Sequence, residues 1–446
     1  MPADGPVLES VDKVLGKALP EAVGRWRQVG STKEMAQFSG ASLRFLAIEE
    51  EQQDSSALAQ VAQLLCLKQT AKSVETLPVD ADEGTRSRAA RTDFSYGNEC
   101  AILRLHADVL NSRGVRVPKL YHAGSSDDGG SFNLLMEALP TKDESNGGDE
   151  QQDLLWGQLA TIPAGPETLA VIQWLARFHA TFLPEEIGGG GILASPPAES
   201  PEKAHLWDVA SHTALERRPQ SELEKLPQML RDFFREFANE DPFFTGETGG
   251  IAEKLQRFAP LIANRLRPGV NPSTGAEGGA TRPFVTLCHG DLKQGNLMFR
   301  RNAEGGAEVA AIDWQWTGPG VGPADLFYAM YMGFADSVVD NYEEAVVRPY
   351  YNELRTHLLR DGKTVVEDPY PYDRILQEFK LAGLDFMRWI TAARLKDYTV
   401  GKLRKAAAED PVDVNRGSWS RSVPRLAWAW KRSKEWLEEV EDLLNS

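Results

Sequence analysis

The residues whose types and spacing could do chemistry are concentrated in one stretch about two-thirds of the way along the chain. Asp291 ends a His-Gly-Asp triplet, Asn296 lies five positions later, and Asp313 follows the apolar run 308–312. Phosphoryl transfer requires this set, because one acid accepts the proton of the attacking hydroxyl while an amide and a second acid hold metal ions. The pattern predicts Asp291 as a catalytic residue and predicts Asn296 and Asp313 as magnesium ligands.

Short apolar runs are expected to position these side chains. Residues 284–288 and 296–299 are typical of strands that flank a catalytic loop, and 308–312 is typical of a next strand that delivers Asp313. His-Gly-Asp alone is usually an ordinary turn, and only the flanking strands and the later acid favour a functional interpretation. Lys293 stands where protein kinases of the Ser/Thr type place a lysine near the transferred phosphate. A solvated lysine is an equal alternative there.

A lysine and a glutamate far upstream form a second candidate group. Residues 61–69 have a buried-strand pattern that includes Lys68, and 94–110 have apolar residues along one helical face, with Glu99 in the first turns. Such a pair would hold an ammonium group against the α- and β-phosphates of ATP. A lysine at a strand end is more often a surface residue, but the downstream motif favours the functional pair. The polar residues 69–93 predict an insertion loop.

Two further strand pairs are expected in the first third of the chain. Residues 26–35 and 42–48 predict a hairpin whose turn contains Ser39 and Gly40, groups that could contact phosphate. An ordinary turn is equally consistent with this sequence, because the glycine-rich loop of protein kinases is absent. Residues 117–124 and 131–140 predict a second pair around the turn at 127–130.

Taken together, these motifs resemble the aminoglycoside phosphotransferase and choline kinase superfamily, relatives of the protein kinases, over about residues 25–335. Asp313-Trp-Gln-Trp and the segment 322–328, Gly-Pro-Ala-Asp-Leu-Phe-Tyr, are most similar to its ecdysteroid-kinase-like, or CHK kinase-like, branch. The resemblance implies an α+β, bilobal protein-kinase-like fold. A small β-rich N-lobe would precede a larger, mainly helical C-lobe with inserted helices.

The resemblance also implies roles for residues that the local sequence leaves open. Met136 would border the nucleotide pocket, and the backbone carbonyl of Glu137 and amide of Leu139 would bind the adenine edge. An edge strand that ends at Pro140 is the alternative. His179 is expected to be a hydrogen-bonded core histidine that supports the catalytic loop, and Asp325 either anchors that loop or caps a helix.

Three regions are expected along the chain. Residues 1–140 form the nucleotide-binding N-lobe, the acidic and polar residues 141–153 form a linker, and 154–446 form the C-lobe with the catalytic loop, the metal site and a helical substrate-binding region. Helices are predicted at 166–183, 226–237, 251–266, 342–359 and 372–407, with an amphipathic end that contains several tryptophans.

Composition narrows the partners and the compartment. The chain has 446 residues, of which 42% are hydrophobic, and this is sufficient for sizeable cores. The net charge of -16 argues against nucleic acid or an anionic membrane as the main partner. The three cysteines lie in apolar runs without paired spacing, which favours a reducing compartment. No secretory signal or membrane-spanning run is visible, so a cytoplasmic location is expected.

The sequence therefore predicts an ATP- and Mg²⁺-dependent phosphotransferase whose acceptor is a hydroxyl group of a small molecule. Two alternatives stay open: a protein kinase, and a catalytically inactive nucleotide-binding scaffold. The replacement of Asp-Phe-Gly by Asp313-Trp-Gln and the lack of a following Ala-Pro-Glu argue against the first. The joint presence of Lys68, Glu99, Asp291 and their partners argues against the second.

Overall fold

The chain folds into two compact units, which are described separately. The structure, a computed structural model, describes residues 8–35, 41–49, 61–73, 77–78, 80–139, 156–191, 205–246, 250–266, 284–302, 305–359, 368, 370–395, 399–409 and 422–445. The first unit comprises Met1–Gly157, Pro196–Trp207 and Met298–Trp316, and the second comprises Gln158–Ser195, Asp208–Leu297 and Thr317–Ser446. The linker predicted at 141–153 lies outside the described residues.

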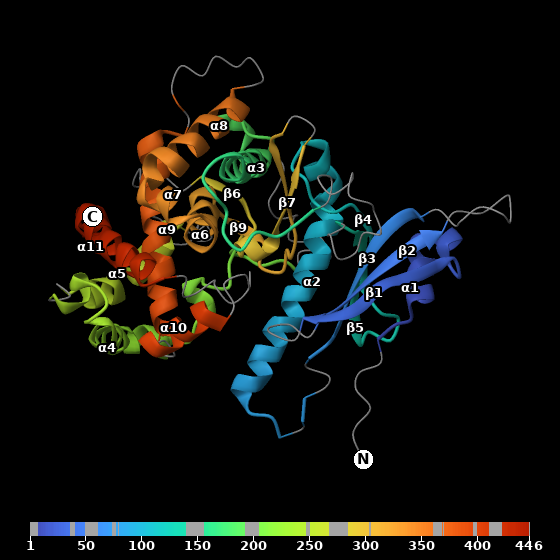
Figure 1. The fold of residues 1–446 in the computed structure, drawn as a ribbon, viewed down its shortest axis with the longest axis horizontal. Coiled ribbons are helices and arrows are strands. Elements are labelled where there is room, and N and C mark those ends of the chain that lie inside the picture. Colours follow the sequence, from blue (N-terminus) through green and yellow to red (C-terminus); the bar gives the residue numbers. More distant parts are fainter. Residues whose placement is uncertain are drawn as a thin grey trace, which may run out of the picture. The chain divides into compact units, whose positions relative to one another are not determined.

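A five-stranded antiparallel sheet forms the centre of the first unit (Figure 1). Its spatial order is β1-β2-β3-β5-β4, and its strands are β1 (Trp26–Met35), β2 (Ala41–Glu49), β3 (Val61–Ala71), β4 (Leu120–Ser125) and β5 (Ser131–Glu137). The predicted hairpin is present as β1 and β2, and Ser39 and Gly40 in its turn lie outside the described residues. In β3, Lys68 is opposite Leu43 of β2 and Leu134 of β5.

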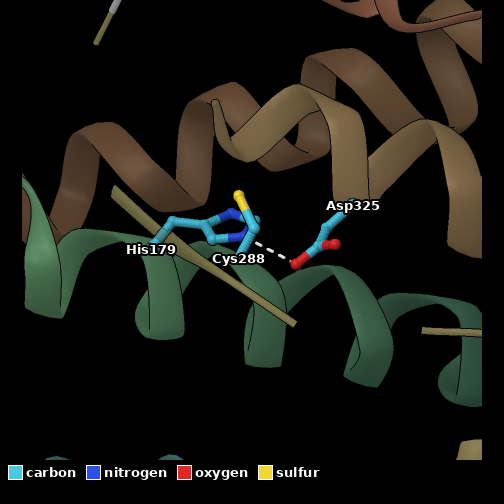
Figure 2. Close-up of side chains that lie close together, drawn as sticks. All are labelled: His179, Cys288 and Asp325. Carbon is cyan, nitrogen blue, oxygen red and sulfur yellow. Dashed lines mark ion pairs between the residues drawn. The ribbon is translucent and has the colours of Figure 1, made fainter. Parts of the chain in front are cut away.

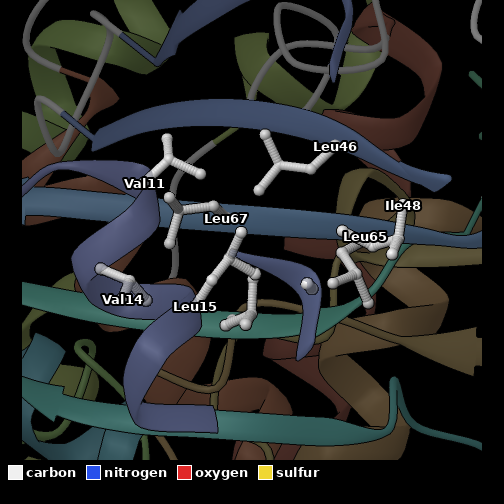
Figure 3. Packing of buried hydrophobic residues seen from close by; sticks show 9 residues of the cluster. Val11, Val14, Leu15, Leu46, Ile48, Leu65 and Leu67 are labelled. Atoms are coloured by element: carbon white, nitrogen blue, oxygen red, sulfur yellow. The ribbon is translucent and has the colours of Figure 1, made fainter. Parts of the chain in front are cut away.

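The helix α1 (Val11–Ala18) covers one face of this sheet (Figure 3). Its N-cap Ser10 accepts a hydrogen bond from the backbone N of Lys13 at 3.4 Å. Apolar residues at helical spacing pack onto apolar residues of the strands, and the cluster contains Val11, Val14, Leu15, Leu46, Ile48, Leu65 and Leu67. Because side chains alternate along a strand, Lys68 points to the face opposite that of Leu65 and Leu67.

The helix α2 (Glu83–Ser112) corrects one expectation. We predicted a loop over 69–93 and a helix that places Glu99 in its first turns, but the helix begins at Glu83 and Glu99 lies in its middle. Asp82 caps the start by accepting a hydrogen bond from the backbone N of Thr85 at 2.9 Å. The first turns are largely polar and solvent-facing, so they show no apolar period, although alanine, arginine and glutamate favour helix.

A hairpin from the middle of the chain belongs to the first unit. It consists of β7 (Leu297–Arg301) and β8 (Ala307–Ala311), and β8 leads directly to Asp313. Met298 and Ala310 pack with Leu139 and Trp156 in a small apolar cluster. This packing fixes the end of β8 within the first unit.

The second unit is mainly helical (Figure 1). Among the described residues, its α-helices are α3 (Pro166–Phe182), α4 (Gln220–Phe237), α5 (Ile251–Leu266), α6 (Gly322–Gly333), α7 (Asp336–Asp340), α8 (Arg348–Leu358), α9 (Tyr372–Ala393), α10 (Val400–Glu409) and α11 (Val423–Asn445). The helix α9 packs against α4, α5, α6 and α11, and it buries Phe379 and Trp389 in the core. Trp430 and Trp436 of α11 are also core residues.

A two-stranded sheet in the second unit positions the predicted catalytic loop. It pairs β6 (Val285–Cys288) with β9 (Gly318–Val321) in antiparallel register. The strand β9 was not predicted, because Gly-Pro-Gly-Val contains two glycines and a proline, which sequence rules assign to turns. The strand leads into α6 without a break.

The predicted fold class is confirmed as α+β, with a β-rich N-terminal unit and a larger, mainly helical C-terminal unit. The three cysteines, Cys66, Cys100 and Cys288, are buried free thiols, as expected. Within the described parts of the chain, no helix has the length and apolar character needed to cross a membrane.

Candidate functional site

Lys68, Glu99 and Asp313 meet within the first unit. The Nζ of Lys68 lies 2.7 Å from Oε2 of Glu99 and 3.4 Å from Oδ1 of Asp313, although the lysine and the aspartate are 245 positions apart in sequence. Burial by itself lowers the pKa of Lys68, but the carboxylates of Glu99 and Asp313 outweigh it and raise this pKa. The lysine is therefore a fixed cation, and its three N–H groups suit a phosphate oxygen.

Asp313 has an unusual backbone conformation. Its φ angle of 67° lies in the left-handed region, which aspartate tolerates better than most residues other than glycine. Its side chain is half-buried, whereas Glu99 is almost fully buried, and Oε1 of Glu99 accepts the backbone N–H of Trp314 at 3.3 Å. Glu99 thus orients both the lysine and the peptide that follows Asp313.

Asp291 lies in the loop that follows β6, in the second unit. Its Oδ1 accepts the hydroxyl of Tyr328 at 2.6 Å and its Oδ2 accepts the ammonium of Lys293 at 2.8 Å. Burial by itself raises the pKa of Asp291, but the nearby ammonium of Lys293 outweighs it and holds the pKa below its usual value. Asp291 is therefore an oriented carboxylate rather than a strong base.

Asn296 is tied to the same loop. Its Nδ2 donates to the backbone carbonyl of Asp291 at 2.8 Å and approaches Oδ2 of Asp291 at 3.3 Å. With the amide nitrogen used in this way, the amide oxygen is the group left to act as a metal ligand. An amide oxygen is a hard donor of the kind that magnesium prefers, and so is the Asp313 carboxylate of the first unit, so each group by itself suits this ion.

Asp325 holds the predicted catalytic loop in place. It lies in the first turn of α6, whose N-cap is Val321, so the helix-cap alternative is wrong. Its Oδ2 instead accepts the backbone N–H of His289 at 2.5 Å, and its Oδ1 accepts that of Gly290 at 2.9 Å. Asp325 therefore anchors the two residues that precede Asp291.

His179 and Cys288 lie beside Asp325 (Figure 2). Nε2 of His179 is 3.5 Å from Oδ2 of Asp325, and its Nδ1 is 2.8 Å from the hydroxyl of Tyr350. The three side chains are close enough to surround a metal ion, but the two backbone amides already bind the Asp325 carboxylate. Burial also raises the pKa of the Cys288 thiol well above its usual value, which disfavours the thiolate that binds metals. We interpret the cluster as loop support.

The predicted hinge residues follow β5. Met136 is opposite Cys66 in the sheet, and the backbone N–H of Glu137 donates to the carbonyl of Lys119 at 2.8 Å. The Glu137 side chain forms an ion pair with Arg116 at 2.6 Å, and Leu139 is buried beside Trp156. Binding of the adenine edge by this segment stays a prediction.

A pocket adjoins the predicted catalytic loop within the second unit. Gly290 and Tyr328 border it, so it lies next to the residues that hold Asp291. Ser211, with φ at 74°, forms part of its wall, and Phe386 of α9 contributes an aromatic face. Strained backbone is often found at binding sites.

Sequence reasoning missed several residues that surround these clusters. Tyr328 lies three positions after Asp325 on α6, a spacing that places both on one helical face, but an aromatic residue in an apolar helix looks like core. His212 gives no local signal at all, although it packs edge-on against Tyr328 with ring centroids 6.3 Å apart.

Comparison with known proteins shows a family to which part of the chain is similar. Residues 166–362 match the ecdysteroid kinase-like family (EcKL), which confirms the resemblance to this kinase-like family over that segment. The matched segment includes Asp291, Asn296, Asp313 and Asp325 but excludes Lys68 and Glu99. No curated protein matches the chain.

Several solved structures are similar to the chain at low identity. An ethanolamine kinase from Plasmodium vivax has a TM-score of 0.41 at 10% identity, with 95% of this chain and 89% of that chain covered. The GDP complex of a wild-type aminoglycoside 2'-phosphotransferase-IIIa has a TM-score of 0.35 at 12% identity, with 96% and 97% covered. A microcompartment-associated aminopropanol kinase has a TM-score of 0.37 at 13% identity, with 94% and 96% covered.

Proposed function

We propose that the chain is an ATP-dependent phosphotransferase that phosphorylates a hydroxyl group of a small molecule. The observation that carries the proposal is the contact of the Lys68 ammonium with both Glu99 and Asp313, at 2.7 and 3.4 Å. A cation oriented by one carboxylate and placed beside a second is the arrangement that phosphoryl transfer uses to bind a nucleotide triphosphate. The match of residues 166–362 to a kinase-like family supports the same conclusion.

Each site residue has a proposed role. Lys68 binds the α- and β-phosphates and is held by Glu99. Asp313 and Asn296 supply oxygen ligands to magnesium, which when bound neutralises the negative charge of the phosphates. Ser39, Gly40, Met136, Glu137 and Leu139 are proposed to contact the nucleotide.

Asp291 is proposed to orient the acceptor hydroxyl and to take its proton. Its lowered pKa makes it a weak base, so most of the rate enhancement must come from positioning and electrostatics. The ammonium of Lys293 lies 2.8 Å from Asp291 and is proposed to stabilise charge on the transferred group. The pocket bordered by Gly290 and Tyr328 gives the acceptor a place beside this carboxylate.

The test is release of ADP by the full-length chain. The protein is incubated with ATP, Mg²⁺ and a panel of hydroxyl compounds that includes amino alcohols, aminoglycosides and sterols. We expect ADP to form with at least one compound and to fall by about 10²–10⁴-fold in Asp291→Asn. Equal ADP release by this variant and the wild type would contradict the proposal. Transfer of labelled phosphate to a peptide array and to none of the small compounds would favour a protein kinase instead.

A further inference from the structure

Asn98 precedes Glu99 on α2 and makes three hydrogen bonds to other segments of the first unit. Its Nδ2 donates to the backbone carbonyl of Trp314 at 3.2 Å and to that of Gln315 at 3.3 Å. Its Oδ1 accepts the backbone N–H of Trp207 at 3.0 Å. The side chain is fully buried, and both ends of its amide are therefore bound to backbone groups.

Trp207 binds the same segment from a second direction. Its Nε1 donates to the carbonyl of Gln315 at 2.8 Å, and its ring stacks on Trp316 with centroids 5.4 Å apart and planes 9° apart. Phe94 of α2 contacts the Trp207 ring, with centroids 4.1 Å apart. The segment 314–316 is thus held by α2 and by residue 207 together.

These bonds act on the two peptide groups that follow Asp313. Because Asp313 adopts a left-handed φ, the chain keeps this conformation only when its surroundings determine it. Asn98 binds the carbonyls of the next two residues, and Glu99 binds the N–H of the next residue. The direction in which the Asp313 carboxylate points therefore depends on these contacts.

We propose that Asn98 is a positioning residue that fixes the Asp313 carboxylate for a magnesium ion, with Trp207 as a second support. The inference rests on the proposed function, in which Asp313 is a metal ligand. Loss of the Asn98 amide removes one donor from each of the carbonyls of Trp314 and Gln315, leaves Trp207 as the donor to Gln315, and loosens the peptides that follow Asp313. The ion pair between Lys68 and Glu99 uses neither Asn98 nor these carbonyls, so metal-free nucleotide binding does not depend on Asn98.

The experiment measures binding rather than turnover. Titration calorimetry of the full-length chain gives the affinity for the non-hydrolysable nucleotide AMP-PNP, once with Mg²⁺ and once with EDTA. The ratio of the two affinities is the magnesium gain. We expect Asp313→Asn to abolish the gain and Asn98→Ala to lower it about tenfold, with the affinity in EDTA changed by less than about twofold. In the double variant, Asn98→Ala should add no further loss, because it acts through Asp313.

Asn111→Ala is the matched control, since Asn111 is also on α2 and its Oδ1 accepts a backbone N–H, that of Val117, at 3.2 Å. It should leave the magnesium gain unchanged. If Asn98→Ala fails to fold, Trp207→Phe tests the inference instead, because it keeps an aromatic ring but loses the hydrogen bond to the Gln315 carbonyl. We expect this variant to lower the magnesium gain about threefold.

Two results overturn the inference in distinguishable ways. If Asp313→Asn loses the magnesium gain while folded Asn98→Ala or Trp207→Phe keeps it, Asn98 has no positioning role and the proposed function stands. If the wild-type chain shows no magnesium gain, the proposed function and the inference are both wrong.

Discussion

The two lysines of the candidate site are each paired with a carboxylate, but the two pairs are built differently. Lys68 and Glu99 come from a strand and a helix that are 31 positions apart, and both side chains are buried, at 8% and 2% exposed. Lys293 and Asp291 are two positions apart in one loop, and Lys293 is 22% exposed. The first pair is a tertiary contact in which both side chains are buried, whereas the second is local and joins a partly exposed lysine to a buried carboxylate.

This difference predicts where each pair matters most. A buried ion pair contributes little net stability when intact, but the removal of one partner is strongly destabilising. In the second pair, the buried Asp291 carboxylate keeps its hydrogen bonds with Tyr328 and Asn296 when Lys293 is removed, so this loss should cost less stability. Removal of Lys68 should therefore mainly reduce the stability of its unit. Removal of Lys293 should mainly reduce the rate of phosphoryl transfer.

The largest expected effect is that of Lys68→Met. It leaves the buried Glu99 carboxylate without its cation, so we expect the free energy of unfolding to fall by about 3–5 kcal/mol. Guanidinium denaturation of the full-length chain measures this change. The double variant Lys68→Met/Glu99→Gln should recover at least about 1 kcal/mol. If the loss of unfolding free energy in the double variant equals the sum of the losses in the two single variants, the two side chains do not interact and the comparison is wrong.

Acid should destabilise both units through one buried histidine in each. Burial lowers the pKa of His106 in the first unit and of His212 in the second to about 4. The unfolded chain binds a proton at each histidine below about pH 6.5, whereas the folded chain does so only near pH 4. Each therefore removes about 3 kcal/mol of stability as the pH falls from 6.5 to 4.

The variants His106→Phe and His212→Phe separate these two contributions. Each should flatten the pH dependence of the unfolding free energy between pH 6.5 and 4, as measured by denaturation at a series of pH values. An unchanged slope in both variants would show that other groups cause the acid sensitivity.

Asp325→Asn tests the support of the second pair. The amide oxygen can replace only one of the two carboxylate acceptors that bind the His289 and Gly290 amides, so we expect a loss of about 1–3 kcal/mol in unfolding free energy. ADP formation should fall as well, because the loop that carries Asp291 loses its anchor. Asp340→Asn, at an exposed aspartate of α7, is the control and should change neither quantity. Equal effects of the two substitutions would refute the anchoring role.

The smallest effect on stability is expected for Lys293→Met. We expect a loss of about 1 kcal/mol, because this lysine is partly exposed and the Asp291 carboxylate keeps the hydrogen bonds from Tyr328 and Asn296. ADP release should nevertheless fall by about tenfold or more, since the substitution removes a charge beside Asp291. A stability loss similar to that of Lys68→Met would erase the distinction between the two pairs.

Local spacing made much of the second unit predictable. Asp291, Lys293 and Asn296 lie within six positions, so a short apolar strand is sufficient to present them in one loop, and the structure joins them by hydrogen bonds. The helices at 166–182 and 251–266 were predicted almost to the residue, because each has a clear apolar stripe. The catalytic roles of Asp291, Lys293 and Asn296 stay predictions.

The contacts between distant segments were harder to predict. Lys68 and Glu99 were paired on the strength of the downstream motif, but the start of α2 was placed eleven positions too late (Phe94 rather than Glu83). The strand β9 was missed because its partner β6 lies 30 positions earlier, and pairing, rather than propensity, determines it. Asn98 and Trp207 carried no sequence signal of the bonds that they make.

The sequence by itself determined the residue types that the chemistry needs, the local order in which they occur, and the alternation of strands and helices that carries them. These properties follow from spacing and periodicity within a few turns of chain. Only the tertiary structure decided which side chains hold those residues: Asn98 and Trp207 at the segment after Asp313, and Tyr328 and Asp325 at Asp291 and the residues before it. A buried polar group must find a partner wherever folding places one, and sequence distance does not limit that choice.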